Sequence, residues 1–173
     1  KMMEYRFNTS SDLDGHALGN LILTAMLDMN GSLKDSISYL SKLLDVKHRV
    51  LPISEDSKIT LMGKDYDGNI VEGEHQITSA HRKFETIYYK EEPEVVPEVL
   101  DAIKEADLIL LSMGSLYTSV LPNVICKEVK DALNKTKAPI VYLCNVVTQP
   151  GETDKFTVGD HVEMINRYLE TRK

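Results

Sequence analysis

Two short apolar runs, each followed by a polar loop, decide how this chain is expected to fold. The first reads LILL at 108–111 and is followed by GSLYTS at 114–119; the second reads IVYL at 140–143 and is followed by NVVTQPGETD at 145–154. Short apolar runs that are separated by a helical pattern, here with Val129 and Leu133 on its apolar side, are typical of parallel strands buried on both faces. Because the carboxyl ends of parallel strands share one edge of a sheet, we expect both loops to face the same crevice.

Helices are predicted on both sides of this pair of strands. Apolar residues at helical spacing predict a buried helix from Leu18 to Met29, which Gly31 ends. Ser32 with Asp35 resembles a capping box that starts a second, amphipathic helix. Acidic residues with Pro93 and Pro97 open a third helix. The last helix is predicted to begin at Thr157, with Asp160 as its capping partner.

The middle of the chain predicts antiparallel strands. Asp67-Gly68 lies between two short runs and predicts a β-hairpin across residues 59–74. Phe84–Tyr89 alternates like a half-exposed strand, and Arg49–Ile53 is a further candidate. The predicted fold class is therefore α/β: a mostly parallel sheet with helices on both faces, plus a small antiparallel hairpin. Residues 1–173 are expected to form a single domain, because no shift in composition marks a second one.

Composition excludes several classes of protein. With 173 residues, 42% hydrophobic and 27% charged, the chain can form a substantial core. A net charge of −7 argues against a nucleic-acid-binding protein, which needs a basic face. No apolar run approaches the ~20 residues of a membrane span, and the first residues do not resemble a secretory signal. Cys126 and Cys144 lie among apolar residues, as reduced thiols do, so we expect a cytoplasmic protein.

The first loop offers groups that could bind a phosphate. Gly114 is followed by the hydroxyls of Ser115, Tyr117, Thr118 and Ser119 just before a helix, where backbone N–H groups are also available. The alternative is structural: Thr118 and Ser119 could cap the helix while Tyr117 packs in the core. Both interpretations stay open at this point.

The second loop is longer than a strand–helix turn requires. Its candidate ligand-binding residues are Asn145, Thr148, Gln149, Glu152, Thr153 and Asp154. Pro150-Gly151 alone would be ordinary turn chemistry, and exposed carboxylates are usually only solvated. Beside a phosphate, however, Asp154 would need a divalent cation such as Mg²⁺, or a sugar hydroxyl, between the two negative charges.

His16 lies between glycines at a predicted helix start, with Asn20 four residues later on the same face. Both are candidate ligand-binding residues, although a lone histidine is more often a structural hydrogen-bonding residue than a catalyst. No metal-ligand spacing involves the other histidines. The chain also has no phosphate-binding Walker loop and no Gly-x-Ser-x-Gly motif. Catalytic residues are therefore not assigned.

Three strings carry a resemblance to a known family. They are the loop with its continuation, GSLYTSVLPN at 114–123; the pair CN at 144–145 with TQPGETD at 148–154; and GHALGNL at 15–21, preceded by YRF at 5–7. Together they resemble the bacterial gluconeogenesis factor family, which is related to the phospholactate transferase (CofD-like) proteins of deazaflavin cofactor synthesis. One departure is Ser112-Met113, where the family usually has Gly-Pro.

The resemblance implies a Rossmann-like, CofD-like fold and a cytosolic protein that binds a nucleotide diphosphate sugar of the UDP-sugar type. Its role would be linked to cell shape and cell-wall precursor supply under gluconeogenic growth. The alternative is a Mg²⁺-dependent transferase that moves a phospholactate-type group from a nucleotide carrier to an alcohol acceptor.

The family pattern also includes an N-terminal strand and a Gly-Gly-Gly-Thr-Gly loop, whereas this chain has nine glycines and no such cluster. We therefore expect a domain that is incomplete at both ends. A parallel sheet that lacks a strand exposes unpaired backbone groups, so we also expect a homo-oligomer.

Overall fold

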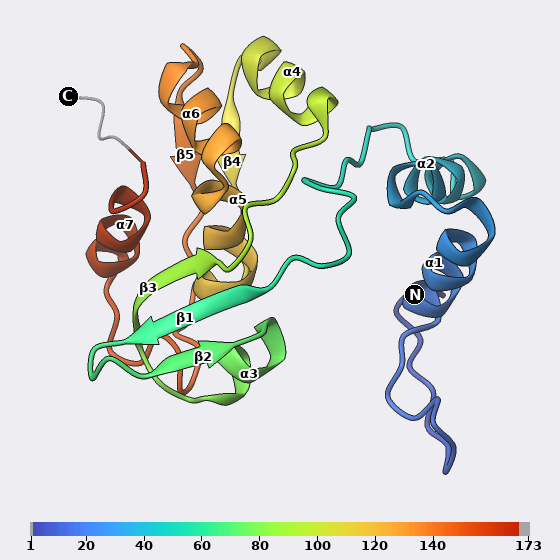
Figure 1. The fold of residues 1–173 in the computed structure, drawn as a ribbon, viewed down its shortest axis with the longest axis horizontal. Coiled ribbons are helices and arrows are strands. Elements are labelled where there is room, and N and C mark those ends of the chain that lie inside the picture. Colours follow the sequence, from blue (N-terminus) through green and yellow to red (C-terminus); the bar gives the residue numbers. More distant parts are fainter. Residues whose placement is uncertain (1, 170–173) are drawn as a thin grey trace. The chain divides into compact units, whose positions relative to one another are not determined.

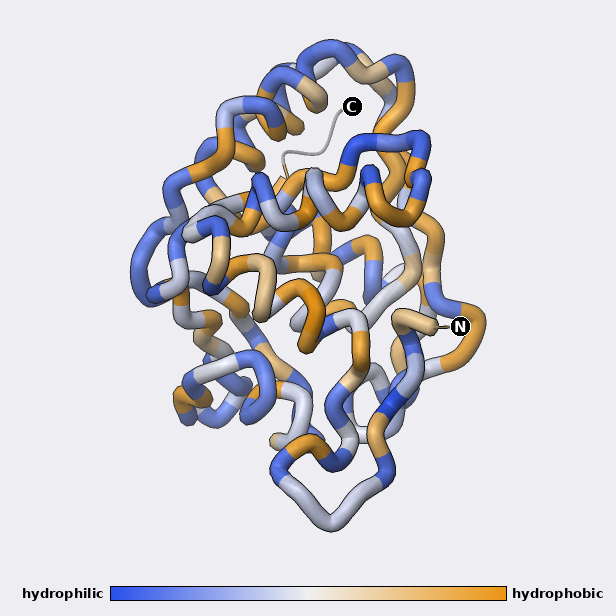
Figure 2. Tube along the Cα trace, turned by 90° about the vertical axis from the view of Figure 1, so that its right-hand side faces the viewer, coloured by the Kyte–Doolittle hydropathy of each residue, from blue (hydrophilic) through white to orange (hydrophobic). Residues whose placement is uncertain are grey.

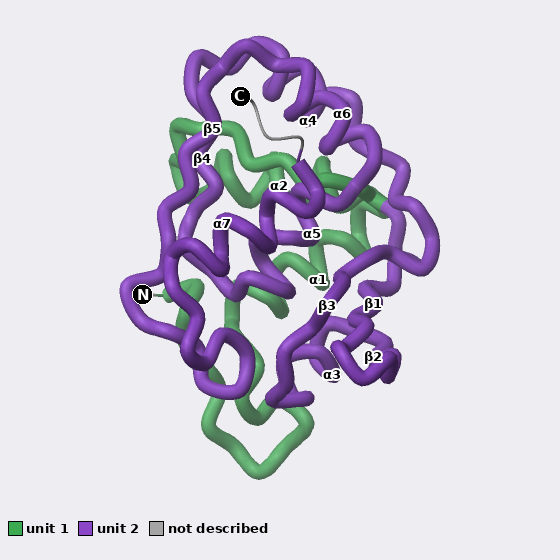
Figure 3. The backbone as a smooth tube through the Cα atoms, turned by 90° about the vertical axis from the view of Figure 1, so that its left-hand side faces the viewer, with its two compact units in different colours: residues 1–55 green, residues 56–173 purple. Residues whose placement is uncertain are grey.

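The computed structural model describes residues 2–169 and divides into two compact units, residues 1–55 and 56–173 (Figure 3). The single domain predicted from the sequence stays a prediction, and each unit is described by itself. The first unit carries two helices, and the second carries every strand and the remaining helices (Figure 1).

The first unit is built from α1 (Leu18–Asn30) and α2 (Leu33–Leu43), which contact each other. Gly31 ends α1 as predicted, in the left-handed conformation with φ 72°. The Ser32 hydroxyl accepts a hydrogen bond from Asp35 N at 3.1 Å and donates to Glu55 Oε1 at 2.7 Å, so it joins the start of α2 to the end of the unit. The prediction that α1 is buried is wrong, because none of its residues is buried in the described chain.

The strand predicted at Arg49–Ile53 does not form, and these residues run without regular secondary structure. Pro52 has no N–H to donate, and a strand exists only where a neighbouring strand supplies hydrogen-bond partners. Sequence alternation alone does not provide that partner.

The second unit begins with an antiparallel sheet in the order β2-β1-β3. Its strands are β1 (Leu61–Asp65), β2 (Ile70–Glu72) and β3 (Phe84–Tyr89), with the short helix α3 (Glu74–Ser79) between β2 and β3. The hairpin predicted around Asp67-Gly68 is present, and Met62 pairs with Glu72 across it. Gly63 is required by packing, because a Cβ there would lie 2.7 Å from the Phe84 ring.

The two apolar runs form the parallel pair β4 (Ile109–Leu111) and β5 (Ile140–Tyr142), with Leu110 opposite Val141. Helix α4 (Pro97–Glu105) precedes β4. A π-helical turn, η1 (Leu116–Val120), then α5 (Leu121–Ile125) and α6 (Lys127–Lys135) connect β4 to β5. The last helix, α7 (Val158–Asn166), begins at Thr157 with a full capping box to Asp160, as predicted.

The architecture is therefore mixed α/β, but a mostly parallel sheet is not confirmed. Within residues 2–169 three of the five strands form the antiparallel sheet, and only β4 and β5 pair in parallel. The reason is local: the hairpin places β1 between β2 and β3, so the middle of the chain forms its own sheet rather than adding strands to the parallel pair.

The core of the second unit lies where η1 and α5 meet the antiparallel sheet. Tyr117 and Phe84 are almost fully buried, with their rings edge-to-face at a centroid separation of 5.4 Å. The Tyr117 hydroxyl also accepts a hydrogen bond from Phe84 N at 3.2 Å. Tyr117 therefore packs in the core, which the structural interpretation of the first loop predicted.

Within residues 2–169 no helix has the length and apolar character needed to cross a membrane. The trace alternates between apolar and polar segments along the described chain (Figure 2).

The turn of the hairpin generates the first prediction. Asp65 is buried and accepts hydrogen bonds from Asn69, Arg82 and the backbone of Asp67. These contacts, the Asn69 side chain first, lower the pKa of the Asp65 carboxyl from 3.8 to about 2. Asp65→Asn should lower the free energy of unfolding at neutral pH. A lowered pKa stabilises the fold above pH 3.8, and that contribution disappears as the pH falls through about 2. The difference between wild type and variant in urea unfolding should shrink over the same range.

Asp67→Asn is the matched control, because Asp67 is the exposed carboxylate of the same turn. A difference for Asp65→Asn that stays constant from neutral pH to about pH 2 would contradict the role assigned to its charge.

Candidate functional site

The two polar loops follow strands that run in the same direction. β4 ends at Leu111 and β5 ends at Tyr142, and these two residues are paired in the parallel ladder. The loops that follow therefore leave the same edge of the pair, near η1 and α5 (Figure 1).

Asn145 joins the second loop to the first. Its Oδ1 accepts a hydrogen bond from Gly114 N at 3.2 Å, and its Nδ2 donates to Gly114 O at 2.8 Å. One side chain thus satisfies both backbone polar groups of the glycine. Adjacent to this contact, a Cβ at Gly114 would lie 2.9 Å from Ser119 Cβ, so the loop is closely packed at this point.

Glu152 makes the second connection. Its Oε1 accepts hydrogen bonds from Ser115 Oγ at 2.7 Å and from Tyr117 N at 3.0 Å. Ser115 Oγ in turn accepts from Thr118 N at 3.2 Å and from Thr118 Oγ1 at 2.8 Å. Several donors that the sequence offered for a phosphate are therefore used inside the protein, and a carboxylate lies at the start of η1.

The second loop is held by its own side chains. Thr153 is fully buried and its Oγ1 accepts from Gln149 N at 2.8 Å, while Asp154 Oδ2 accepts from Gly151 N at 2.6 Å. Thr148 and Asp154 are exposed at the surface of this loop. These contacts give the TQPGETD string a fixed shape and explain the residue types at 153 and 154.

His81 is a neighbour of this loop that the sequence did not identify. A Cβ at Gly151 would lie 2.3 Å from His81 Nδ1, and Gly151 has φ 78°, so only glycine fits there. His81 itself adopts φ 48°, which is uncommon for a residue other than glycine. Nearby, Lys83 Nζ lies 4.5 Å from the centroid of the Phe156 ring. No spacing pattern links residues 81–83 to 151–156, so the sequence carried no signal for this contact.

Two tyrosines close in sequence to the loops, the buried Tyr117 and the half-buried Tyr142, have raised pKa values. Burial raises the pKa of Tyr117 to about 12, and it does the same for Tyr142, with smaller contributions from Cys144 and Glu152. Both hydroxyls therefore stay protonated near neutral pH. They can donate or accept hydrogen bonds there, but they cannot act as bases.

His16 and Asn20 belong to the first unit, and both are exposed. His16 O accepts a hydrogen bond from Phe7 N at 3.1 Å, within a short antiparallel contact between Arg6 and Ala17. Their part in a site with the two loops stays a prediction.

No group of three or more His, Cys, Asp or Glu residues close enough to hold a metal ion occurs within residues 2–169. Asp154 could supply one carboxylate oxygen, since only Oδ2 is used by Gly151 N. That would suit Mg²⁺, which commonly takes one or two carboxylates and completes its shell with water and phosphate oxygens. A magnesium site at Asp154 stays a prediction.

Comparison with known proteins identifies the family. Residues 1–173 match the family model described as 2-phospho-L-lactate transferase CofD. Gluconeogenesis factors of Bacillus subtilis and Listeria monocytogenes are 40% and 42% identical over 169 and 171 residues, which are 97% of this chain and 53% and 52% of the relatives. A crystal structure of a UPF0052-family protein from Bacillus halodurans superimposes with a TM-score of 0.89 at 41% identity, covering 97% of this chain and 54% of that one.

The fold is that of a CofD-like mixed α/β protein. This chain belongs to the CofD family, and the resemblance to gluconeogenesis factors that its motifs indicated is confirmed. The chain spans about half the length of the curated relatives it matches.

The loop junction generates the second prediction. Glu152→Ala would leave Ser115 Oγ and Tyr117 N without their acceptor, and the free energy of unfolding should fall by about 1–3 kcal/mol. Glu152→Gln retains an acceptor oxygen and should cost clearly less. Glu163→Ala is the control, because it removes an exposed α7 carboxylate that lies 3.6 Å from the Arg167 guanidinium and should cost only a few tenths of a kcal/mol. Equal losses for all three variants, measured by chemical denaturation, would show that Glu152 does not hold the loops together.

Proposed function

We propose that this chain forms part of a binding site for a nucleotide diphosphate sugar of the UDP-sugar type. In this proposal the protein is cytoplasmic and acts as a ligand-responsive regulator linked to cell-wall precursor supply and cell shape during growth on gluconeogenic carbon. Its similarity to proteins named gluconeogenesis factors supports the link to growth on gluconeogenic carbon.

The observation that carries the proposed site is the direct contact between the two loops. Asn145 and Glu152 of the second loop hydrogen-bond to residues 114–117 of the first. Two segments 30 or more residues apart thereby present their polar groups at one edge of the strand pair, where open α/β sheets bind ligands. This arrangement suits a ligand long enough to contact both loops.

The groups that remain at the surface suit the two ends of such a ligand. Ser119 and Thr148 carry exposed hydroxyls, and Val146 and Val147 are 91% and 75% exposed. In the proposed complex the hydroxyls contact phosphate or sugar oxygens, and the valines contact a ring of the ligand. Lys83, beside Phe156, brings a positive charge to the same loop and would offset the phosphates.

A second candidate function is the Mg²⁺-dependent transfer of a phospholactate-type group from a nucleotide carrier to an alcohol acceptor. The description of the matching family model favours it. Both functions require a bound diphosphate, and turnover of a nucleotide-linked substrate would distinguish the transferase from the regulator.

The third prediction concerns ligand binding itself. A UDP-sugar at 100 times its dissociation constant should raise the free energy of unfolding by about 2.7 kcal/mol, since it binds only the folded state. Thermal shift and calorimetry would measure this on the chain and on a version extended at both ends. Thr148→Val should weaken binding, whereas Thr78→Val on α3, an exposed threonine outside the two loops, should not.

No response of either version to UDP-sugars at millimolar concentration would overturn the proposal. A response of the extended version alone would show that residues outside this chain complete the site.

The fourth prediction concerns Asp154. A carboxylate ~4 Å from a phosphate charge, at an effective dielectric near 20, is repelled by about 4 kcal/mol, so a cation or a sugar hydroxyl must separate them. Asp154→Asn keeps an oxygen that can accept from Gly151 N and removes only the charge. With a bridging Mg²⁺, the variant should bind more weakly and lose its dependence on Mg²⁺. With a sugar hydroxyl, affinity should fall by about 1–3 kcal/mol with and without Mg²⁺.

Calorimetry on the extended protein at several Mg²⁺ concentrations separates these outcomes, and Asp107→Asn, an exposed carboxylate before β4, is the control. Unchanged affinity would place Asp154 outside the ligand site, and increased affinity would show that it only repels the ligand.

A further inference from the structure

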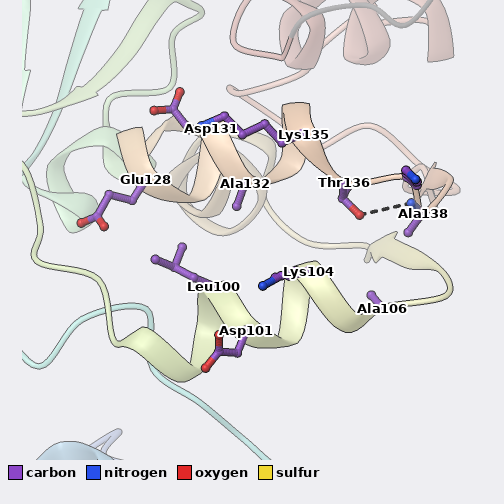
Figure 4. Close-up of a pocket in the computed structure, with 11 residues that line it drawn as sticks. Leu100, Asp101, Lys104, Ala106, Glu128, Asp131, Ala132, Lys135, Thr136 and Ala138 are labelled. Carbon is purple, nitrogen blue, oxygen red and sulfur yellow. Dashed lines mark hydrogen bonds between the residues drawn. The ribbon is translucent and has the colours of Figure 1, made fainter.

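A groove of about 700 Å³ separates α4 from α6, on a part of the second unit that the two loops do not use. Both helices precede strands of the parallel pair, so they lie side by side and run in the same direction. Figure 4 shows Leu100 and Lys104 of α4 pointing toward α6, with Glu128 at one end of the groove and Thr136 and Ala138 at the other.

The floor of the groove is apolar and incompletely covered. Leu100, Ala106 and Ala132 are only half-buried although all three line the groove. The contact between α4 and α6 therefore leaves apolar surface that a further element could cover.

The charges that line the groove are separated along its length. Glu128 lies in the first turn of α6, Asp101 and Asp131 lie at the middle of their helices, and Lys104, Lys135 and Lys137 lie at or just beyond the C-terminal ends. The positions of Glu128 at a helix start and of Lys104 and Lys135 in the last turns suit the helix dipoles. The lining is neutral in sum, with carboxylates at the start and middle of the helices and lysines at their ends. A neutral lining does not complement the charge of a nucleic acid or another polyanion.

The charges on α4 are complementary to those of a second α4 that runs in the opposite direction. Asp101 and Lys104 are three residues apart and so share one face of α4. When a second α4 lies antiparallel to the first, Asp101 of each copy comes opposite Lys104 of the other. Within residues 2–169 neither residue forms an ion pair in the single chain.

We propose that the groove between α4 and α6 binds α4 of a second copy of this chain, in a two-fold symmetric dimer with antiparallel α4 helices. The same contact occurs twice, because in a two-fold symmetric dimer each copy inserts its own α4 and also binds the α4 of the other copy. The inserted helix covers the apolar floor, and the paired charges fix its direction. This interface is separate from the loop junction, so the dimer proposal is independent of the proposal for nucleotide-sugar binding.

The test exchanges charges between copies. Asp101→Lys alone and Lys104→Asp alone each place like charges opposite one another across the axis, and each should raise the dimer dissociation constant by about tenfold or more. An equimolar mixture of the two variants places opposite charges together again. It should form heterodimers with an affinity close to that of the wild type. The chain with both substitutions should also form homodimers, and analytical ultracentrifugation over a range of concentrations measures all four samples.

Asp28→Lys on α1 and Lys42→Asp on α2 change the net charge by the same amounts at other exposed helix positions, and they should leave the dissociation constant unchanged. A wild-type chain that stays monomeric at every concentration would overturn the proposal. So would single variants that dimerise like the wild type, or a mixture that fails to restore the dimer.

Discussion

The Glu152 carboxylate is the contact on which the rest of the loop region depends. It lies on the segment after β5, yet both of its hydrogen-bond donors lie on the segment after β4. A carboxylate that accepts from a hydroxyl and a backbone N–H at the start of a helical turn is a favourable arrangement, because the unpaired N–H groups there carry partial positive charge. The donors of Ser115 and Tyr117 are consequently unavailable to a ligand unless Glu152 moves.

Tyr117 extends this contact into the core. Its N–H donates to Glu152, its ring lies edge-to-face on Phe84, and its hydroxyl accepts from the Phe84 backbone. Phe84 in turn lies against Gly63 so closely that no side chain fits there. A continuous series of contacts thus joins the surface loops to the antiparallel sheet. Tyr117 therefore helps to attach the loops to a packed core, which limits how far they can move without disturbing β1 and β3.

Local signals in the sequence predicted local structure well. Asp67-Gly68 predicted the hairpin, Gly31 ended its helix, and Thr157 with Asp160 formed a capping box, because each depends on neighbouring residues alone. The mostly parallel sheet, the strand at 49–53 and the burial of α1 depend on partners distant in sequence, and there the prediction was wrong or unconfirmed. For the candidate site, the sequence indicated which loops meet but not that Glu152 occupies the donors or that His81 lies on Gly151.

The carboxylates of the second loop show why residue type alone is a weak guide to ligand contacts. Glu152 and Asp154 were both candidates for binding a ligand, yet each accepts a backbone N–H of the protein itself, from Tyr117 and from Gly151. Hydroxyls, an amide and carboxylates gather at a ligand site, but the same groups are needed to satisfy the backbone of a long irregular loop. The distinction lies in which atoms remain exposed after the loop has folded. By that criterion Ser119 and Thr148 are better ligand candidates than the fully buried Thr153, whose hydroxyl serves the loop alone.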